Sequence, residues 1–125
     1  MIRTITFIAR TFRTIDSWPD NVRDIVKFNL QSLQNNQATA FSDLPDWTNQ
    51  GKLTDKPLKG KVKGTYQLTI KDKDSYRIVY VAQYKDKVFV LHAFKKKVEG
   101  ANKAAINTID GRWKRLKADR KAKRI

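Results

Sequence analysis

The sequence contains no cysteine and only one histidine, His92. Without cysteine the chain has no disulfide framework, no thiolate nucleophile and no zinc site built on thiolates. The absence of cysteine is compatible with a reducing compartment. A single histidine with no spaced cluster of carboxylates around it does not make a metal site. We therefore expect no metal ion and no other cofactor.

Long apolar runs are also absent. No stretch approaches the roughly 20 apolar residues that a membrane-spanning helix needs. The first residues, Met1-Ile2-Arg3-Thr4, are followed by neither a long apolar segment nor a small-residue cleavage site. We expect no signal peptide, no membrane partner and a cytoplasmic location.

Acidic residues are few, with 12 Asp and Glu against 27 Lys and Arg, and the net charge is +15. A charge of this size points to an anionic partner such as nucleic acid, an acidic protein or an anionic membrane surface. The chain has 125 residues, which is enough for one domain with a real core but too short for two ordinary domains.

Hydrophobic spacing predicts a domain that begins with a strand and a helix. Ile5 to Ala9 is short and apolar and is typical of a strand. Ser17-Trp18-Pro19-Asp20 has the composition of a helix start, with Ser17 as the cap and Pro19 in the first turn. Apolar residues then follow at helical spacing until Gln34: Val22, Ile25, Val26, Leu30 and Leu33. The segment from 37 to 64 has weaker signals, and we expect Lys56 to Lys63 to be a flexible basic approach to the next strand.

The second half predicts three strands and a helix. Alternation from Tyr66 to Ile70, and β-branched and aromatic residues from Tyr76 to Tyr84 and from Val88 to Phe94, indicate strands joined by short polar turns. A final helix would bury Ala105, Ile109, Trp113 and Leu116, and a basic tail from about 117 is expected to fray. The predicted fold is a single α+β domain over 1–125, in which the N-terminal and C-terminal helices pack on a small antiparallel sheet of about four strands.

Four segments in this order resemble the RelE/ParE superfamily of toxins, and more closely its HigB-like, phage-derived branch. They are Trp18-Pro19 with Leu30-Gln31-Ser32-Leu33-Gln34, then Pro57-Leu58-Lys59-Gly60, then Tyr76-Arg77-Ile78-Val79-Tyr80-Val81, and finally Val90-Leu91-His92-Ala93-Phe94-Lys95-Lys96-Lys97. The resemblance implies a RelE-like fold. It also implies a type II toxin that cleaves messenger RNA, usually on the ribosome, and a cognate antitoxin, typically with a helix-turn-helix domain.

Cleavage of RNA through its own 2′-hydroxyl needs alignment of that oxygen, proton transfer and stabilisation of the charge on the phosphate, and it needs no metal. Arg77 is the first candidate catalytic residue, because a guanidinium offers two parallel donors to phosphate oxygens. The alternative for Arg77 is a surface arginine paired with an acid. Lys95, Lys96 and Lys97 are further candidates, or else a solvated basic edge. On a strand, Lys95 and Lys97 would share one face, and Lys96 would share the other with His92.

His92 is a candidate for proton transfer because an ordinary histidine titrates near neutral pH, and the alternative is a histidine satisfied within the sheet. Lys59, Lys61 and Lys63 are expected to hold the RNA backbone. The tyrosines Tyr76, Tyr80 and Tyr84 are more typical of core than of base stacking.

RelE-type members carry basic residues at two positions that are Gln67 and Thr69 in this chain. This difference keeps an alternative open: a relative without catalysis on the same fold, either a nucleic-acid-binding module or a ParE-like inhibitor of DNA gyrase. A third alternative is a basic ribosome-associated binding protein, a function that requires only the positive charge of the chain.

Overall fold

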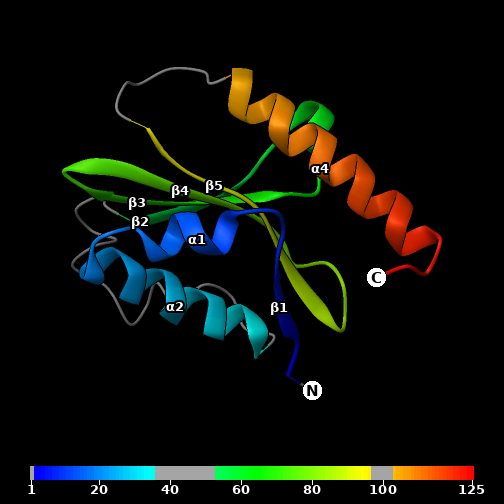
Figure 1. The fold of residues 1–125 in the computed structure, drawn as a ribbon, viewed down its shortest axis with the longest axis horizontal. Helices are drawn as coiled ribbons and strands as arrows, with labels where there is room; N and C mark the ends of the chain where they lie inside the picture. Colours follow the sequence, from blue (N-terminus) through cyan, green and yellow to red (C-terminus); the bar gives the residue numbers. More distant parts are fainter. Residues whose placement is uncertain (1, 36–52, 97–102) are drawn as a thin grey trace.

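The computed structural model describes residues 2–35, 53–96 and 103–125 (Figure 1). The elements are strands β1 (Thr4–Phe7), β2 (Leu53–Pro57), β3 (Tyr66–Asp72), β4 (Asp74–Val81) and β5 (Lys87–Lys96), helices α1 (Thr11–Asp16), α2 (Asp20–Gln34) and α4 (Lys103–Lys121), and the short 3-10 helix η2 (Gly60–Val62). The predicted α+β class is confirmed.

The strands form one sheet in the order β1-β5-β4-β3-β2. The predicted antiparallel meander is confirmed as β3, β4 and β5. The sheet has five strands and is mixed, because β1 pairs parallel to β5. A parallel neighbour requires a long crossover, and α1 and α2 lie in that connection.

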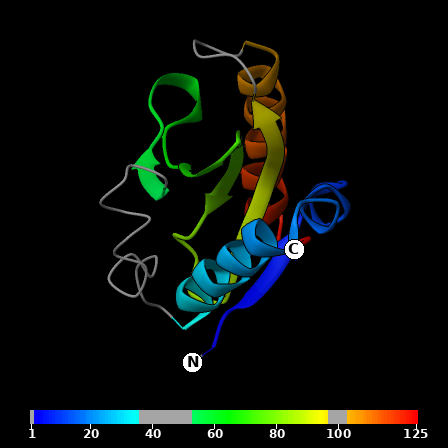
Figure 2. The same ribbon diagram turned by 90° about the vertical axis from the view of Figure 1, so that its left-hand side faces the viewer.

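The sheet lies between two layers of helices, with α1 and α2 on one side and α4 on the other (Figures 1 and 2). Two buried clusters fill the spaces between these layers. The cluster under α2 includes Val22, Val26, Leu68 and Ile78. The cluster under α4 includes Val79, Val81, Phe89, Leu91, Ile109, Trp113 and Leu116. Each strand therefore has a face toward α2 and a face toward α4, as strand alternation requires.

The helix boundaries differ in detail from the expectation. The apolar face predicted for α2 is buried. The prediction that Ser17 caps this helix is wrong: Pro19 occupies the N-cap position of α2, and Ser17 closes α1 instead, where its hydroxyl donates to the Thr14 carbonyl at 2.6 Å. The six-residue helix α1 was not predicted, because so short a segment shows no periodicity.

The basic segment before β3 is ordered, so the expectation of a flexible approach is wrong. Lys56 and Pro57 end the edge strand β2, which pairs antiparallel with β3 from Leu53 to Pro57, and Gly60–Val62 form η2. Asp55, Lys56 and Pro57 are poor strand formers, which explains why the pattern was weak. Proline is tolerated at an edge because no neighbour needs its missing N–H.

The C-terminal helix extends further than expected. Its predicted buried residues are confirmed, from Ala105 to Leu116, but the helix continues to Lys121, into the segment expected to fray. Arg120 explains this extension, because its guanidinium donates to the Asp86 carboxylate at 2.9 Å and lies 4.4 Å from the centre of the Tyr84 ring. Among the helices of the described ranges, none is long and apolar enough to cross a membrane.

Candidate functional site

The face of the sheet toward α4 carries most of the predicted catalytic residues. Arg77 and Val79 are two residues apart on β4, and Val79 belongs to the cluster under α4. Because alternate residues of a strand point to the same side, Arg77 also lies on this face, which we call the α4 face.

Strand register places the other candidates around Arg77. Arg77 is opposite Phe94, and the neighbouring pairs along the same two strands are Ser75 with Lys96 and Val79 with His92. Residues on one face of adjacent strands in successive pairs lie within reach of long side chains. The fold therefore brings Arg77, His92 and Lys96 together on the α4 face, on β4 and β5.

Arg77 is half-buried and lies in the middle of this group. Its Nε donates a long hydrogen bond of 3.4 Å to the Ser75 hydroxyl. Among the described residues no salt bridge joins Arg77 to an acid, which disfavours the alternative of an arginine paired with a carboxylate. The guanidinium therefore has N–H groups available to donate hydrogen bonds to a phosphate.

His92 is held from two sides. Its ring stacks on Phe94 with the ring centres 4.9 Å apart, and its Nδ1 is 3.2 Å from Nη1 of Arg112. The same Nη1 donates to the Leu91 carbonyl at 2.7 Å, which fixes the guanidinium beside β5. Since arginine is only a donor, Nδ1 accepts and the ring proton of neutral His92 resides on Nε2.

Burial, reinforced by the positive charge of Arg112, lowers the pKa of His92 to about 4. Both causes disfavour the charged imidazolium. His92 is therefore neutral at pH 7, which differs from the expectation of an ordinary histidine that titrates near neutrality. Arg112 was missed because it lies 20 residues away on α4, where nothing in its helical spacing marks it.

The predicted alternation of the lysines is confirmed for two of the three. Lys96 is opposite Ser75 and lies on the α4 face, whereas Lys95 is opposite Tyr76 and lies on the other face. There the Lys95 ammonium is 3.5 Å from the Asp74 carboxylate. Lys97 lies outside the described residues. Of the predicted lysine cluster, the structure brings Lys96 to the site and leaves Lys95 on the opposite side of the sheet.

The two positions that depart from the RelE pattern lie directly beside this group. Thr69 is opposite Arg77 on β3, and Gln67 is opposite Val79. Both side chains are buried, and Gln67 Nε2 is 3.4 Å from Thr69 Oγ1. The strand next to Arg77 therefore contributes neutral, buried polar groups to this side of the site.

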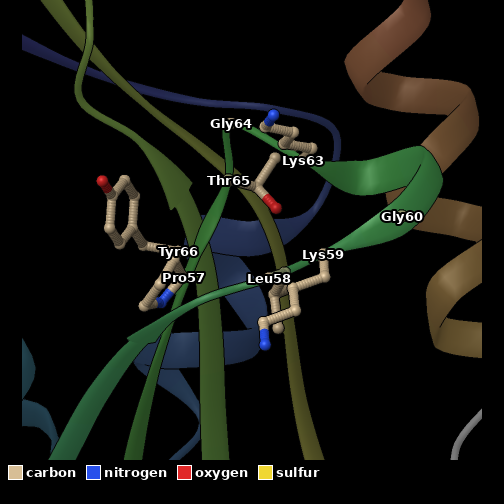
Figure 3. Close-up of a pocket in the computed structure, with 8 residues that line it drawn as sticks. All are labelled: Pro57, Leu58, Lys59, Gly60, Lys63, Gly64, Thr65 and Tyr66. Atoms are coloured by element: carbon tan, nitrogen blue, oxygen red, sulfur yellow. The ribbon is translucent and has the colours of Figure 1, made fainter.

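The three lysines before β3 have different surroundings. The Lys61 ammonium donates to the Asn107 amide oxygen of α4 at 3.0 Å and is 4.0 Å from the Asp110 carboxylate. Lys59 and Lys63 line a hollow of about 530 Å³ formed by Pro57 to Gly60 and Lys63 to Tyr66 (Figure 3).

Two of the three tyrosines expected to be core residues are buried, and the third, Tyr84, is half-buried. Tyr76 and Tyr80 are buried, and Tyr84 packs edge-on against Phe89. In the described ranges, no three side chains of His, Cys, Asp or Glu form a group that could hold a metal ion.

Comparison with known proteins gives a family for most of the chain. Residues 13–114 match the family described as phage-derived protein Gp49-like. None of the curated proteins matches. Among solved structures, a chain of the toxin–antitoxin complex RelBE2 from Mycobacterium tuberculosis is similar, with 20% sequence identity and a TM-score of 0.41 over 77% of this chain and 100% of that one. The matched segment contains Arg77, His92, Lys96 and Arg112. The chain belongs to the Gp49-like family of phage-derived proteins.

Proposed function

We propose that this protein is the toxin of a type II toxin–antitoxin system and that it inhibits translation as a metal-independent endoribonuclease. Its substrate would be messenger RNA, cut on the ribosome in the cytoplasm. The observation that carries the proposal is the grouping of Arg77, Lys96 and the His92–Arg112 pair on the α4 face. The resemblance to RelE- and HigB-type toxins supports the toxin class, and the Gp49-like family match covers the same residues.

The group is suited to stabilise charge on a phosphate. When the 2′-hydroxyl loses its proton to water and attacks the adjacent phosphorus, a 2′,3′-cyclic phosphate forms and the bond to the 5′-oxygen breaks. Negative charge builds on the phosphoryl oxygens and then on the leaving 5′-oxygen, which takes up a proton from water. Fixed donors aimed at such charge lower the barrier without any metal. In the proposal Arg77 donates to the phosphoryl oxygens as a planar fork, and Lys96 adds a positive charge beside it.

His92 would act here as a neutral donor. With Nδ1 occupied by Arg112 and the proton on Nε2, the imidazole presents one N–H to the substrate. Arg112 is thus a positioning residue that fixes the tautomer. When the RNA phosphate binds, it would partly offset the lowering of the His92 pKa by Arg112, because a nearby negative charge favours the imidazolium.

The test is induced expression of wild type, Arg77→Ala and Lys96→Ala, with the new 5′ ends of cellular messenger RNA mapped. Wild type is expected to create new ends within coding sequences. Loss of one charge-stabilising donor is expected to lower cleavage by about 10²- to 10³-fold for Arg77→Ala.

Lys95→Ala is the matched control for Lys96→Ala. It removes the same charge from the adjacent residue, but on the opposite face of β5 and from a lysine already paired with Asp74. Its cleavage should equal that of wild type. Growth arrest without new RNA ends would exclude the nuclease proposal, and equal cleavage by all four proteins would exclude the proposed site.

An antitoxin is the partner that toxin membership implies, and the charge of +15 favours an acidic binding segment in it. We expect a neighbouring reading frame to encode a small protein with a helix-turn-helix domain. Its co-expression should relieve growth arrest, and the two proteins should purify together. Arrest that the neighbouring protein does not relieve would contradict this pairing.

The neutral residues Gln67 and Thr69 beside Arg77 favour a second candidate, a nucleic-acid-binding or ParE-like gyrase-inhibiting relative without catalysis. That protein would arrest growth without new RNA ends. If gyrase is its target, purified wild type would block DNA supercoiling in vitro, a reaction that the nuclease would leave untouched.

A further inference from the structure

We propose that the hollow formed by Pro57 to Gly60 and Lys63 to Tyr66 is a binding subsite for one nucleotide of single-stranded RNA, with the base stacked on Tyr66 and the phosphates held by Lys59 and Lys63. The subsite rests on the proposed action on RNA. It adds a second contact with RNA, outside the group of Arg77, His92 and Lys96 on the α4 face, which we call the Arg77 group. The hollow measures about 530 Å³, within the usual range of small-ligand sites.

Tyr66 provides the stacking surface. It is 41% exposed, whereas Tyr76 and Tyr80 are 5% and 3% exposed. One side of its ring is stacked on Tyr80, with the ring centres 5.7 Å apart and the planes inclined by 20°. An exposed tyrosine backed by a second ring presents a flat apolar surface, which suits the face of any base.

The support beneath Tyr66 is fixed. The Tyr80 hydroxyl donates to the Asp55 carboxylate of β2, so the lower ring is held by the neighbouring edge strand. Burial and the Asp55 charge raise the pKa of Tyr80, which keeps this hydroxyl a donor. Because the platform is already ordered, little rotamer freedom remains to be lost when a base stacks on it.

The walls of the hollow are fixed as well. The Leu58 N–H donates to the Thr65 carbonyl at 2.9 Å, which closes the connection between β2 and β3. The Trp113 indole donates to the Lys63 carbonyl at 3.0 Å and ties this connection to α4. Val62 is buried under the same helix. The hollow is therefore preformed rather than assembled by a ligand.

The charge at the hollow fits a phosphate backbone. Lys59 and Lys63 are exposed, and Lys61 between them is already engaged with Asn107 of α4. Figure 3 shows the Lys63 side chain above Thr65, the Lys59 side chain directed downward and the Tyr66 ring to the left. The two lysines and the exposed ring point away from one another but line the same hollow, and together they supply the two features of sites for single-stranded nucleic acid.

The hollow and the Arg77 group are close enough to serve one strand. Tyr66 lies three residues before Thr69, which is the partner of Arg77, so the two sites are roughly 10 Å apart along β3. The Tyr66 ring and Arg77 lie on opposite faces of the sheet, because Tyr66 is paired with Tyr80 of the cluster under α2, whereas Arg77 lies on the α4 face. An RNA strand that reaches both passes around the β2 edge.

The experiment measures binding of an uncleavable probe, a 2′-O-methyl RNA about eight nucleotides long with 2-aminopurine in its sequence. Anisotropy reports affinity, and quenching of 2-aminopurine reports stacking. Tyr66→Ala is expected to weaken binding by roughly five- to 150-fold and to abolish the quenching. Tyr66→Phe keeps the ring and should bind and quench like wild type. Phe12→Ala, which removes an exposed aromatic residue on α1, is the matched control and should change neither readout.

The lysines are tested by salt dependence with a double variant, Lys59→Ala with Lys63→Ala. Loss of two contacts to single-stranded phosphates should reduce the slope of log affinity against log salt by about 1.4. Lys121→Ala with Lys123→Ala removes the same charge from the end of α4 and should change the slope less. The comparison of the two double variants does not use Tyr66→Ala, so it tests the subsite even if that variant does not fold.

The outcomes separate the subsite from the function. If wild type binds the probe and Tyr66→Ala folds and binds equally well, or the two double variants have equal slopes, the subsite is wrong and the nuclease proposal stands. If wild type does not bind the probe at all, the subsite is wrong, whereas the nuclease proposal is decided separately by the mapped ends of cellular messenger RNA. Loss of quenching with Tyr66→Ala but not with Tyr66→Phe would establish the stacked base.

Discussion

At the scale of single residues, the structure changes the role of His92 most. Sequence reasoning identified it as the one side chain with an ordinary pKa near neutrality, because composition shows no other histidine. Its environment was not visible from the sequence, since Arg112 comes from another element. The faces of Lys95 and Lys96 were predictable because strand alternation is local, whereas the pairing of Lys95 with Asp74 depends on how β4 and β5 align.

Because His92 is the only histidine, its titration can be followed without assignment by NMR of the imidazole carbons. In wild type we expect a midpoint near pH 4, set first by burial and then by the charge of Arg112. Arg112→Leu removes the charge but keeps most of the burial, so the midpoint should rise while staying below the ordinary 6.5. A wild-type midpoint at 6.5, or no change in the variant, would contradict the His92–Arg112 arrangement.

At the scale of elements, long periodic segments were predictable and short contextual ones were not. The faces of α2 and α4 and the β3–β4–β5 meander follow from local spacing of apolar residues. Strand β2 is stabilised instead by pairing with β3 and has little strand propensity of its own. The order in the connection that follows comes from α4, through Trp113 and Asn107, and a sequence pattern does not show such contacts.

Two glycines in this connection offer a matched pair for stability. Both have positive φ, +69° at Gly60 and +99° at Gly64. A methyl group at Gly60 meets nothing within 4 Å, so Gly60→Ala should cost about 1–2 kcal/mol of backbone strain. At Gly64 it would lie 3.2 Å from the Trp113 ring.

Gly64→Ala should therefore cost more than Gly60→Ala, because it strains the backbone and displaces the tryptophan that ties the connection to α4. Urea unfolding, followed by Trp113 and the other tryptophans, measures both free energies. Equal losses would show that the close approach of Gly64 to Trp113 does not limit this site.

At the scale of the whole molecule, the basic character divides into parts with different tasks. Arg77, Lys96 and Arg112 lie around one face of the sheet. Lys59 and Lys63 line the hollow before β3. Arg120, at the end of α4, is engaged with Asp86 and stabilises the helix. The net charge follows from the composition, but the distribution of the basic residues among these sites follows only from the fold.

The central claim is that the α4 face cleaves RNA through the 2′-hydroxyl. The most direct measurement is the chemistry of the cut ends, made with the purified protein, ribosomes and a messenger RNA that carries a single 2′-deoxynucleotide at the mapped site. Attack by the 2′-hydroxyl predicts 2′,3′-cyclic or 3′-phosphate ends on normal RNA and no cleavage at the deoxy position. Ends with 3′-hydroxyl and 5′-phosphate, or undiminished cleavage at the deoxy position, would contradict the account.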